Sequence, residues 1–171
     1  MNDKVVIRKG NKEDASKMVE YLKEIGGESD FLTFGKNELN VNVSDEENFI
    51  DNSNKNENSL FLVAEVNGKI VGNLNFSAGK NSKVRHVGEF GVSVLKAYWG
   101  NKIGNELIEY LIKWSKHTGI IKKINLMVRE DNVRAIKLYK KIGFVEEGIL
   151  KREFLSEGKF YSGISMGFYV N

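Results

Sequence analysis

The chain has no cysteine in its 171 residues and contains just two histidines. The lack of cysteine excludes disulfide bonds, thiolate metal sites and a cysteine nucleophile. The two histidines, His86 and His117, are too few for a histidine-rich site, so we expect no bound metal. The sequence also lacks any apolar run close to the length of about 18 residues that suggests a membrane-spanning helix.

The first ten residues, MNDKVVIRKG, contain no hydrophobic signal-peptide region, so we expect a cytoplasmic protein without a membrane partner. The formal net charge is +3, and the lysines are scattered among acids instead of gathered into one arm. We therefore expect no nucleic-acid partner. With 41% hydrophobic and 29% charged residues, the chain is expected to form one globular domain, residues 1–171, with a sizeable core.

Helix signals are clear in the first third of the chain. Asn11 is expected to cap a helix with an apolar stripe, and this helix is expected to stop at Gly26–Gly27. After a polar, acidic stretch, Ser44 and Glu47 have the spacing of a capping box for a second helix.

Turn and cap signals organise the rest. Asn67–Gly68 tolerates positive φ and predicts a two-residue hairpin turn. Asp131 is expected to cap a later helix that ends at Gly143, and SEGK, residues 156–159, joins two final strands. The resulting order, β-α-α-β-β-β-α-β-α-β-β, predicts a single α/β domain around a mixed sheet.

The segment YWGNKIGNELIEYL, residues 98–111, follows a predicted strand and begins a predicted helix. The unpaired N–H groups at such a helix start, together with the helix dipole, favour an anion. The glycines would let the backbone approach a ligand closely. The signal is weak by itself, and the segment is neither a P-loop nor a dinucleotide fingerprint.

A second motif, NVRAIKLYKKIGFVEEG, lies about thirty residues further on. Together with VSVLKAYWGNKIGNELI it resembles the acetyl-CoA binding motifs of the GNAT superfamily of N-acetyltransferases. The more specific half of the resemblance is the Asn-x-x-Ala-x-x-x-Tyr-x-x-x-Gly-Phe pattern. The C-terminal sequence is most similar to enzymes that acetylate spermidine or ribosomal-protein N-termini.

The resemblance implies a GNAT-like fold with a mixed, mostly antiparallel sheet of about six to seven strands, flanked by about four helices. It also implies acetyl transfer from acetyl-CoA to a primary amine, by direct attack in a ternary complex. The acceptor would be an amine-bearing small molecule or a protein N-terminus, and a homodimer is compatible with the family. The implied cofactor-binding residues are Val92, Val94, Trp99, Gly100, Asn101, Lys102, Ile103, Gly104, Asn105, Asn132 and Tyr139.

The glycine turn departs from the family pattern Arg/Gln-x-x-Gly-x-Gly/Ala. Alignment on Gly104 places Trp99 at the Arg/Gln position and Lys102 at the first glycine. If Lys102 lies in the first helical turn, its φ is negative and lysine is sterically allowed. Its side chain then either reaches the pyrophosphate as a point charge or is solvated. Trp99 is expected to pack under the turn.

By resemblance, Glu89 is a base for the amine, acting directly or through water, and Tyr139 is the acid for the leaving thiolate. The alternatives are a surface glutamate and a core tyrosine. Strand N–H groups near Val92 to Val94 would stabilise the carbonyl oxygen. Asn132 would contact the cofactor, although it is also a good helix cap.

Acceptor-side candidates are Phe31, Phe34 and Glu38, within an acidic stretch that either attracts a cationic amine or is simply solvated. The two phenylalanines would line the acceptor cleft or pin their loop to the core. Two other functions remain open: a catalytically silent acyl-CoA binding or sensor module, and an interaction protein without a ligand.

Overall fold

A computed structural model describes residues 3–36 and 38–171. Its helices and strands follow one another in the order expected from the sequence. They are β1 (Val5–Lys9), α1 (Ala15–Glu28), α2 (Val43–Lys55), β2 (Ser59–Val66), β3 (Lys69–Ala78), β4 (Val87–Val94), α3 (Ile103–Thr118), β5 (Lys123–Arg129), α4 (Val133–Ile142), β6 (Val145–Ser156) and β7 (Lys159–Tyr169).

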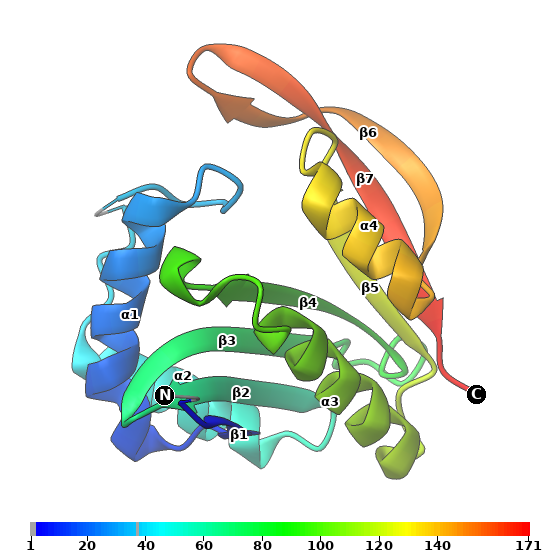
Figure 1. Cartoon of the computed structure of the whole chain (residues 1–171). Helices are drawn as coiled ribbons and strands as arrows, with labels where there is room; N and C mark the ends of the chain where they lie inside the picture. Colours follow the sequence, from blue (N-terminus) through cyan, green and yellow to red (C-terminus); the bar gives the residue numbers. More distant parts are fainter. Residues whose placement is uncertain (1–2, 37) are drawn as a thin grey trace.

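The seven strands form one sheet in the order β1-β2-β3-β4-β5-β7-β6. Neighbouring strands are antiparallel except β4 and β5, which are parallel. β4 and β5 pair through three residues each, Val87–Glu89 with Lys123–Asn125, and then diverge (Figure 1). Within residues 3–36 and 38–171, this mixed, mostly antiparallel sheet and its four α-helices confirm the predicted fold class.

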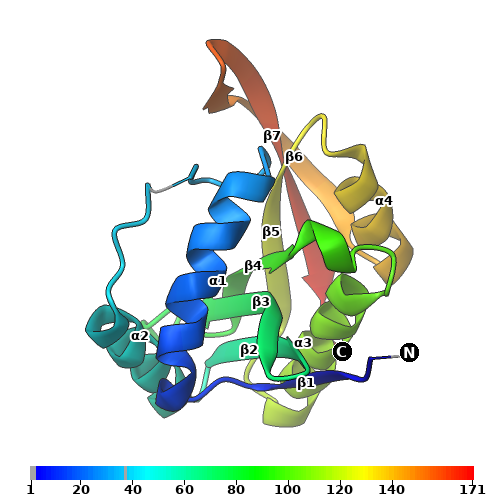
Figure 2. The same cartoon turned by 60° about the vertical axis from the view of Figure 1, so that its left-hand side comes forward.

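The helices cover both faces of the sheet: α1 and α2 lie on one face, and α3 and α4 on the other (Figure 2). On the second face, α3 packs on β1 to β4. Phe144, directly after α4, packs on Phe168 of β7 at a ring-centroid distance of 5.4 Å. The two helices of this face therefore cover different halves of the sheet, and the boundary between the halves is where β4 and β5 diverge.

Helix α1 does not stop at Gly26–Gly27 as predicted but continues to Glu28. The glycines permit a close contact instead. A Cβ on Gly26 would lie 3.0 Å from the carbonyl oxygen of Gly35 and 3.3 Å from the ring of Phe34. The missing side chain therefore lets the following loop pack directly on the helix.

The start of α2 also differs from the prediction. The cap is Asn42, whose Oδ1 accepts a hydrogen bond from the backbone N–H of Asp45 at 2.8 Å. Ser44 and Glu47 lie inside the helix and form no capping box, so the prediction was displaced by two residues. An asparagine oxygen satisfies the same unpaired N–H group that a serine would, and it is among the best capping groups.

The predicted turns are confirmed. Asn67 and Gly68 have φ values of 49° and 79°, and they join β2 to β3. Glu157 and Gly158 have φ values of 49° and 74° and join β6 to β7. Two consecutive residues with positive φ suit the right-handed twist of the flanking strands. Within the described residues, no helix has both the length and the apolar character needed to cross a bilayer.

The outer strand β6 and the helix α4 contribute little to the core. No side chain of α4 is fully buried, and β6 is exposed along most of its length. The fully buried apolar side chains lie mainly in the β1–β4 half, for example Phe61, Leu62, Leu74 and Leu107. The position of the β5–β7 half therefore depends on specific contacts across the boundary.

Arg129, at the end of β5, makes several of those contacts. Its guanidinium donates two hydrogen bonds to Asp131, at 2.7 and 3.0 Å, and two to Asp30, whose backbone oxygen and carboxylate lie at 3.0 and 3.1 Å. It also stacks between the rings of Phe31 and Tyr161, 4.6 and 4.2 Å from their centroids. The hydrogen bond from Arg129 holds the pKa of Asp131 below its usual value. Arg129 thus links the loop after α1 to the β6–β7 hairpin.

We expect Arg129→Met to lower the free energy of unfolding by about 2 kcal/mol, because it removes charge-assisted hydrogen bonds but leaves partly exposed carboxylates that water can solvate. Lys55→Ala is the matched control, since it breaks an exposed ion pair with Asp51 and should change the free energy of unfolding much less. Denaturant titration measures both. Equal losses in the two variants would contradict the structural role of Arg129.

Candidate active site

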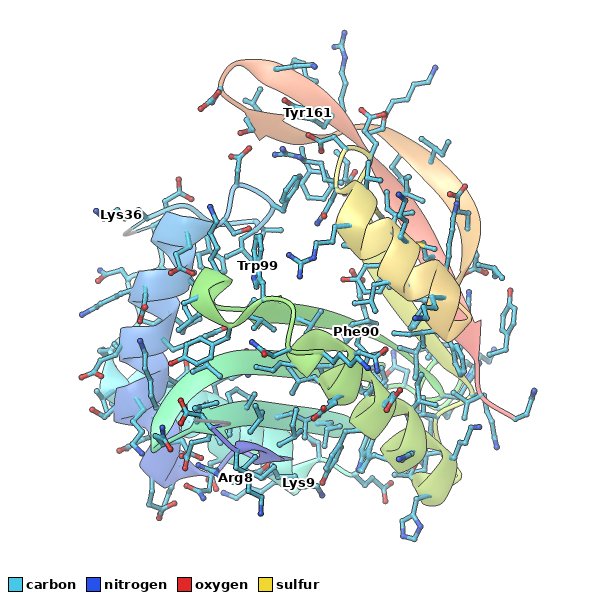
Figure 3. The ribbon with its side chains drawn as sticks, viewed as in Figure 1. Arg8, Lys9, Lys36, Phe90, Trp99 and Tyr161 are labelled. Atoms are coloured by element: carbon cyan, nitrogen blue, oxygen red, sulfur yellow. The ribbon has the colours of Figure 1, made fainter. Side chains whose placement is uncertain are left out.

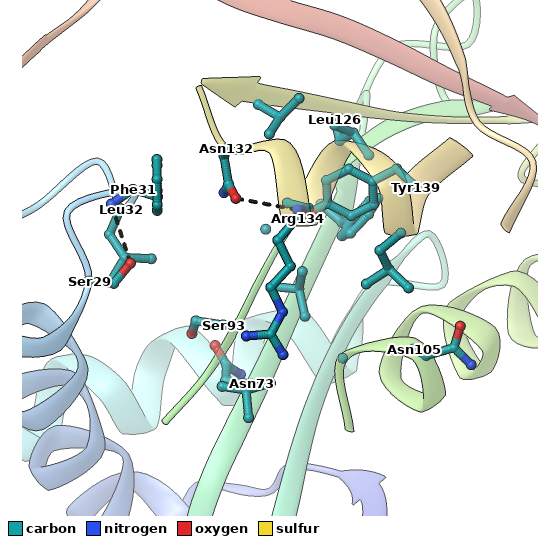
Figure 4. Close-up of a pocket in the computed structure, with 18 of the residues that line it drawn as sticks. Ser29, Phe31, Leu32, Asn73, Ser93, Asn105, Leu126, Asn132, Arg134 and Tyr139 are labelled. Atoms are coloured by element: carbon teal, nitrogen blue, oxygen red, sulfur yellow. Dashed lines mark hydrogen bonds between the residues drawn. The ribbon is translucent and has the colours of Figure 1, made fainter. Parts of the chain in front are cut away.

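A cavity of about 1550 Å³ lies where β4 and β5 diverge. Its walls come from α1 and the α1–α2 loop, β3, β4, the segment before α3, α3, β5, α4, β6 and β7. Figure 3 shows Trp99 on the segment between β4 and α3, and Tyr161 on the β6–β7 hairpin. Figure 4 shows side chains of both halves of the sheet directed into the cavity. The cavity is therefore bounded by both halves of the molecule.

Most of the predicted site residues line this cavity. They are Phe31, Phe34, Glu89, Val92, Val94, Trp99, Gly100, Lys102, Ile103, Gly104, Asn105, Asn132 and Tyr139. Glu38 and Asn101 are not among the lining residues. The Glu38 carboxylate accepts a hydrogen bond from the backbone N–H of Gly35 at 2.9 Å, within its own loop. The Asn101 side chain donates to the backbone oxygen of Tyr98 at 3.0 Å and so closes the turn.

The start of α3 has the character of an anion site. Unlike α2 and α4, which are preceded by asparagine caps, α3 is preceded by Lys102, whose side chain forms no capping hydrogen bond. The first backbone N–H groups of a helix have no partner within the helix, and they carry its positive dipole end. A Cβ on Gly104 would meet nothing closer than Val94, at 3.9 Å. Space therefore remains in front of this first turn for a ligand.

Lys102 has a φ of 61°, in the left-handed region. The condition considered for a negative φ, a place in the first helical turn, is not met, because Lys102 is the residue before the helix. A glycine adopts this conformation freely, whereas a residue with a Cβ is strained there. The family pattern has glycine at this position, and the backbone geometry explains that preference.

Trp99 was expected to pack under the turn, and it is 41% exposed in the structure. The indole Nε1 donates a hydrogen bond to the backbone oxygen of Val94 at 2.8 Å. The guanidinium of Arg134, on α4, lies 4.6 Å from the ring centroid. Arg134 extends from α4 into the cavity (Figure 4), so this stacked pair connects the two walls.

Tyr139, on α4, lies in an aromatic cluster. Its ring packs edge-on against Phe90 and Phe144, at centroid distances of 6.1 and 5.9 Å. Burial raises the pKa of Tyr139 to about 12. The phenol is therefore neutral at physiological pH and retains its proton as a hydrogen-bond donor. The same contacts also give Tyr139 a packing role. A role as proton donor and a role in packing are therefore compatible for this residue.

β4 presents different chemistry to the two faces of the sheet. Phe90 points toward α4, where it meets Tyr139, and Val94 points toward Gly104 of α3. Ser93 points to the opposite face, because its hydroxyl bonds Tyr21 of α1 at 2.7 Å. By strand alternation Glu89 and Gly91 share the Ser93 face. Glu89 is exposed and lines the cavity.

Asn73 and Asn75 of β3 also line the cavity, and sequence reasoning missed them. They pair across the sheet with Ser93 and Gly91, so they lie on the same face as Glu89. The buried Asn73 side chain donates to the backbone oxygen of Leu62 at 2.8 Å. The signal was available in GNLNFS, residues 72–77, where polar side chains alternate along a strand.

Asn132 caps α4, because its Oδ1 accepts a hydrogen bond from the N–H of Ala135 at 3.3 Å (Figure 4). Asp131, the predicted cap, instead pairs with Arg129. The capping role of Asn132 does not depend on a ligand, and its position in the cavity wall leaves it able to contact one.

Cations outnumber acids on the α3–α4 side of the cavity, where Glu109 of α3 is the acidic lining residue. The cations of the cavity, apart from Arg129, lie on α3, on α4 and just before α3; they are Lys102, Lys113, Lys116, Arg134 and Lys141. This wall suits a polyanion such as a nucleotide. Among the described residues, no group of three or more His, Cys, Asp or Glu side chains could hold a metal ion.

The sequence pattern of the acetyltransferase (GNAT) family matches residues 17–144. The chain belongs to this family, as its motifs indicated. A GNAT-family acetyltransferase from Streptococcus pneumoniae has a TM-score of 0.94 at 32% identity, over 98% of this chain and 100% of that one. The yncA protein of Salmonella typhimurium, solved with its cofactor acetyl-CoA, has a TM-score of 0.85 at 18% identity, over 98% and 94% of the two chains, which shows a shared fold.

Curated relatives match a smaller part of the chain. The L-amino acid N-acetyltransferase AaaT of Escherichia coli (strain K12) is 31% identical over 105 residues, which cover 61% of this chain and 65% of that protein. An N-alpha-acetyltransferase of Sulfurisphaera tokodaii is 34% identical over 115 residues, which cover 61% of this chain and 67% of that protein. The names of these two relatives thus refer to L-amino acids in one case and to N-alpha acetylation in the other.

We expect Lys102→Gly to raise the free energy of unfolding by about 1 kcal/mol, because glycine relieves the left-handed strain. Lys102→Ala removes the same charge but keeps the strain, so it should not stabilise the protein. Thermal or denaturant unfolding distinguishes the two. Their acetyl-CoA affinities at two salt concentrations show the role of the charge: an equal, salt-dependent loss in both variants identifies a pyrophosphate contact, and no loss identifies a solvated lysine.

Proposed function

We propose that the protein transfers an acetyl group from acetyl-CoA to a primary amine, by direct attack of the amine within a ternary complex. The observation that carries this proposal is the separation of β4 from β5 beyond Glu89. It lets a cofactor on the α3–α4 face and an acceptor on the α1–α2 face meet in one cavity. Family membership supports the same reaction.

The cofactor would lie along the cationic wall. Its pyrophosphate would accept hydrogen bonds from the backbone N–H groups of residues 101–105, at the uncapped start of α3. The pantetheine arm contains two amide groups, and the β4 edge that faces the cavity beyond Glu89 has backbone groups without a partner strand. Val92 and Val94 lie on this part of β4, and Asn132 faces it from α4.

The acceptor must lose a proton before it attacks. An alkylammonium with a pKa of about 10.4 is neutral in roughly one molecule in a few thousand at pH 7. Glu89 lies on the acceptor face and is open to water, so it can receive this proton through an ordered water molecule. Backbone N–H groups near Val92 to Val94 would donate to the carbonyl oxygen as it gains negative charge.

The leaving thiolate needs a donor, which is the role proposed for Tyr139. With a pKa of about 12, its phenol keeps its proton throughout the working pH range. Full transfer to a free thiolate, whose conjugate acid has a pKa of about 8.5, would be uphill. Tyr139 would therefore act first as a hydrogen-bond donor to the developing thiolate, and complete transfer would follow when the thiolate gains basicity in the buried site.

We expect Tyr139→Phe to lower kcat by about 10²- to 10⁴-fold, because it removes the donor and keeps the ring. The aromatic cluster should survive, so unfolding and acetyl-CoA affinity should change little. Steady-state CoA release measures the rate, and a thermal shift with acetyl-CoA is the control. A joint loss of stability and activity would instead identify a purely structural tyrosine.

We expect the rate deficit of Glu89→Gln to be large near neutral pH and to shrink as pH rises. At higher pH more of the amine is already deprotonated, so the base matters less. The measurement is kcat/KM for the amine across the pH range in both enzymes. A deficit that does not vary with pH would remove Glu89 as the base and leave the rest of the mechanism intact.

A catalytically silent acyl-CoA binding module is the second candidate. The stacked Trp99–Arg134 pair, which connects the cavity walls, and the strained Lys102 both favour it. Saturable acetyl-CoA binding without acetylation of any amine in a broad panel would select this function.

A further inference from the structure

Strand β6 contains a wide bulge. Its pairing with β7 shifts in register between Leu150 and Phe154. Three residues, Lys151–Glu153, consequently stand opposite the single residue Ser162. Within the bulge, Arg152 has a φ of 57°, in the left-handed region that a residue with a Cβ enters at a cost. Bulges are common next to active sites, where they change the direction of a side chain.

The side chain that this bulge directs across the sheet is that of Glu153. Its Cγ and Cβ lie 3.0 and 3.1 Å from the position that a Cβ would have on Gly163, and the sulfur of Met127 lies 2.6 Å from the same position. Met127 is on the same face of β5 as Arg129, which contacts the α1–α2 loop. Glu153 therefore reaches the face on which the acceptor is proposed to bind, and it lines the main cavity.

The Glu153 carboxylate is available to a ligand. The residue is exposed, and the ion pairs formed within residues 3–36 and 38–171 do not include it. Two other acids line the cavity. Glu109 accepts a hydrogen bond from Asn105 on the α3–α4 side, and Glu89 of β4 is the proposed base. Glu153 is thus an acid of the acceptor face that neither an ion pair nor the proposed reaction uses.

The described cations that line the cavity leave this charge uncompensated. Arg129 is on the same face, but its guanidinium bonds the carboxylates of Asp131 and Asp30. Arg134 extends into the cavity without an ion pair, and its guanidinium lies over Trp99 on the α3–α4 side, where the phosphates of the cofactor are proposed to bind (Figure 4). Arg134 leaves the cavity open to an acceptor that also carries a carboxylate, but it does not neutralise the carboxylate of β6.

Two further cations belong to the same hairpin and lie outside the cavity lining. The Lys159 ammonium is 5.0 Å from the centroid of the Tyr161 ring, and the Arg152 guanidinium is 5.2 Å from that of Phe160. Both cations are held against aromatic rings, and neither forms an ion pair with Glu153.

Glu89 and Glu153 are far apart on the acceptor face. Glu89 pairs with Asn125, which in turn pairs with Gly167 of β7. Glu153 lies over Gly163, four residues further along β7, in the direction in which β4 and β5 diverge. Four residues of a strand span roughly 14 Å at about 3.4 Å per residue. One ammonium group therefore cannot contact both carboxylates, whereas a linear molecule with a cationic group at each end can.

We propose that Glu153 binds a second, distal ammonium group of the acceptor, so that the protein prefers linear amines with two separated ammonium groups. The inference rests on the proposed acetyl transfer and names its substrate class. The bulge in β6 directs the carboxylate, and the missing side chain of Gly163 gives it room. The distal group would hold the chain while the other amine reacts near β4.

The first test compares 1,8-diaminooctane with n-octylamine, which has the same chain and lacks the second charge. In the unmodified protein, KM for the diamine should be at least about tenfold lower, as a charge-assisted hydrogen bond predicts. Glu153→Gln keeps the size of the side chain and should remove most of this difference. Glu157→Gln is the matched control and should preserve it, because Glu157 is an exposed acid of the same hairpin outside the cavity lining.

The second test reverses the charge. Glu153→Lys should lower KM for 8-aminooctanoate, which carries a distal carboxylate, and should raise KM for 1,8-diaminooctane. A purely structural role of Glu153 would not produce this exchange of preference. A thermal shift with acetyl-CoA checks that each variant is folded and binds the cofactor.

The outcomes separate the two proposals. Acetylation of n-octylamine and 1,8-diaminooctane with equal KM, or a diamine preference that persists in Glu153→Gln, would overturn the inference and leave acetyl transfer intact. If acetyl-CoA binds but the unmodified protein acetylates no amine, the proposed function fails and the inference with it.

Discussion

The brevity of the β4–β5 pairing is the constraint on which the rest of the structure depends. Three residue pairs hold these parallel strands together before they separate. Backbone pairing would otherwise fill the centre of the sheet and leave no passage between its faces. The separation creates the cavity, exposes backbone groups along β4, and places residues from both faces around one space. It also leaves the C-terminal half dependent on contacts such as those of Arg129.

The separation also divides the electrostatics of the cavity. Cations gather on α3, on α4 and before α3, whereas the β3–β4 face beside Glu89 carries amides and a carboxylate. A polyanionic cofactor and a cationic acceptor would then enter from opposite faces, each attracted by its own wall. The charges of the cofactor and of the acceptor would then be compensated at two different places in the cavity. One domain could therefore hold both molecules at the same time.

Local patterns predicted from the sequence proved reliable where the physical cause is local. The Asn67–Gly68 turn and the order of elements depend on neighbouring residues, and the structure confirms both. The φ of Lys102 was left dependent on where the helix begins, because its cause is the path of the turn, not the preference of lysine. The Arg129 contacts were unpredictable, since Asp30 and Tyr161 approach through the tertiary fold. The polar face containing Asn73 was readable in the alternation of β3 but was overlooked.

The divergence of β4 and β5 gives the sheet two extra edges in its interior, beyond Glu89 on one strand and Asn125 on the other. An exposed sheet edge is a template for strands of other molecules and thus a cause of aggregation. Here the Trp99 indole donates a hydrogen bond to the backbone oxygen of Val94, at the β4 edge. The same indole stacks on Arg134 and so connects the two cavity walls beside that edge. A side chain therefore covers part of the interior edge. The cavity can receive a narrow ligand, while pairing of this edge with a strand of another molecule is hindered.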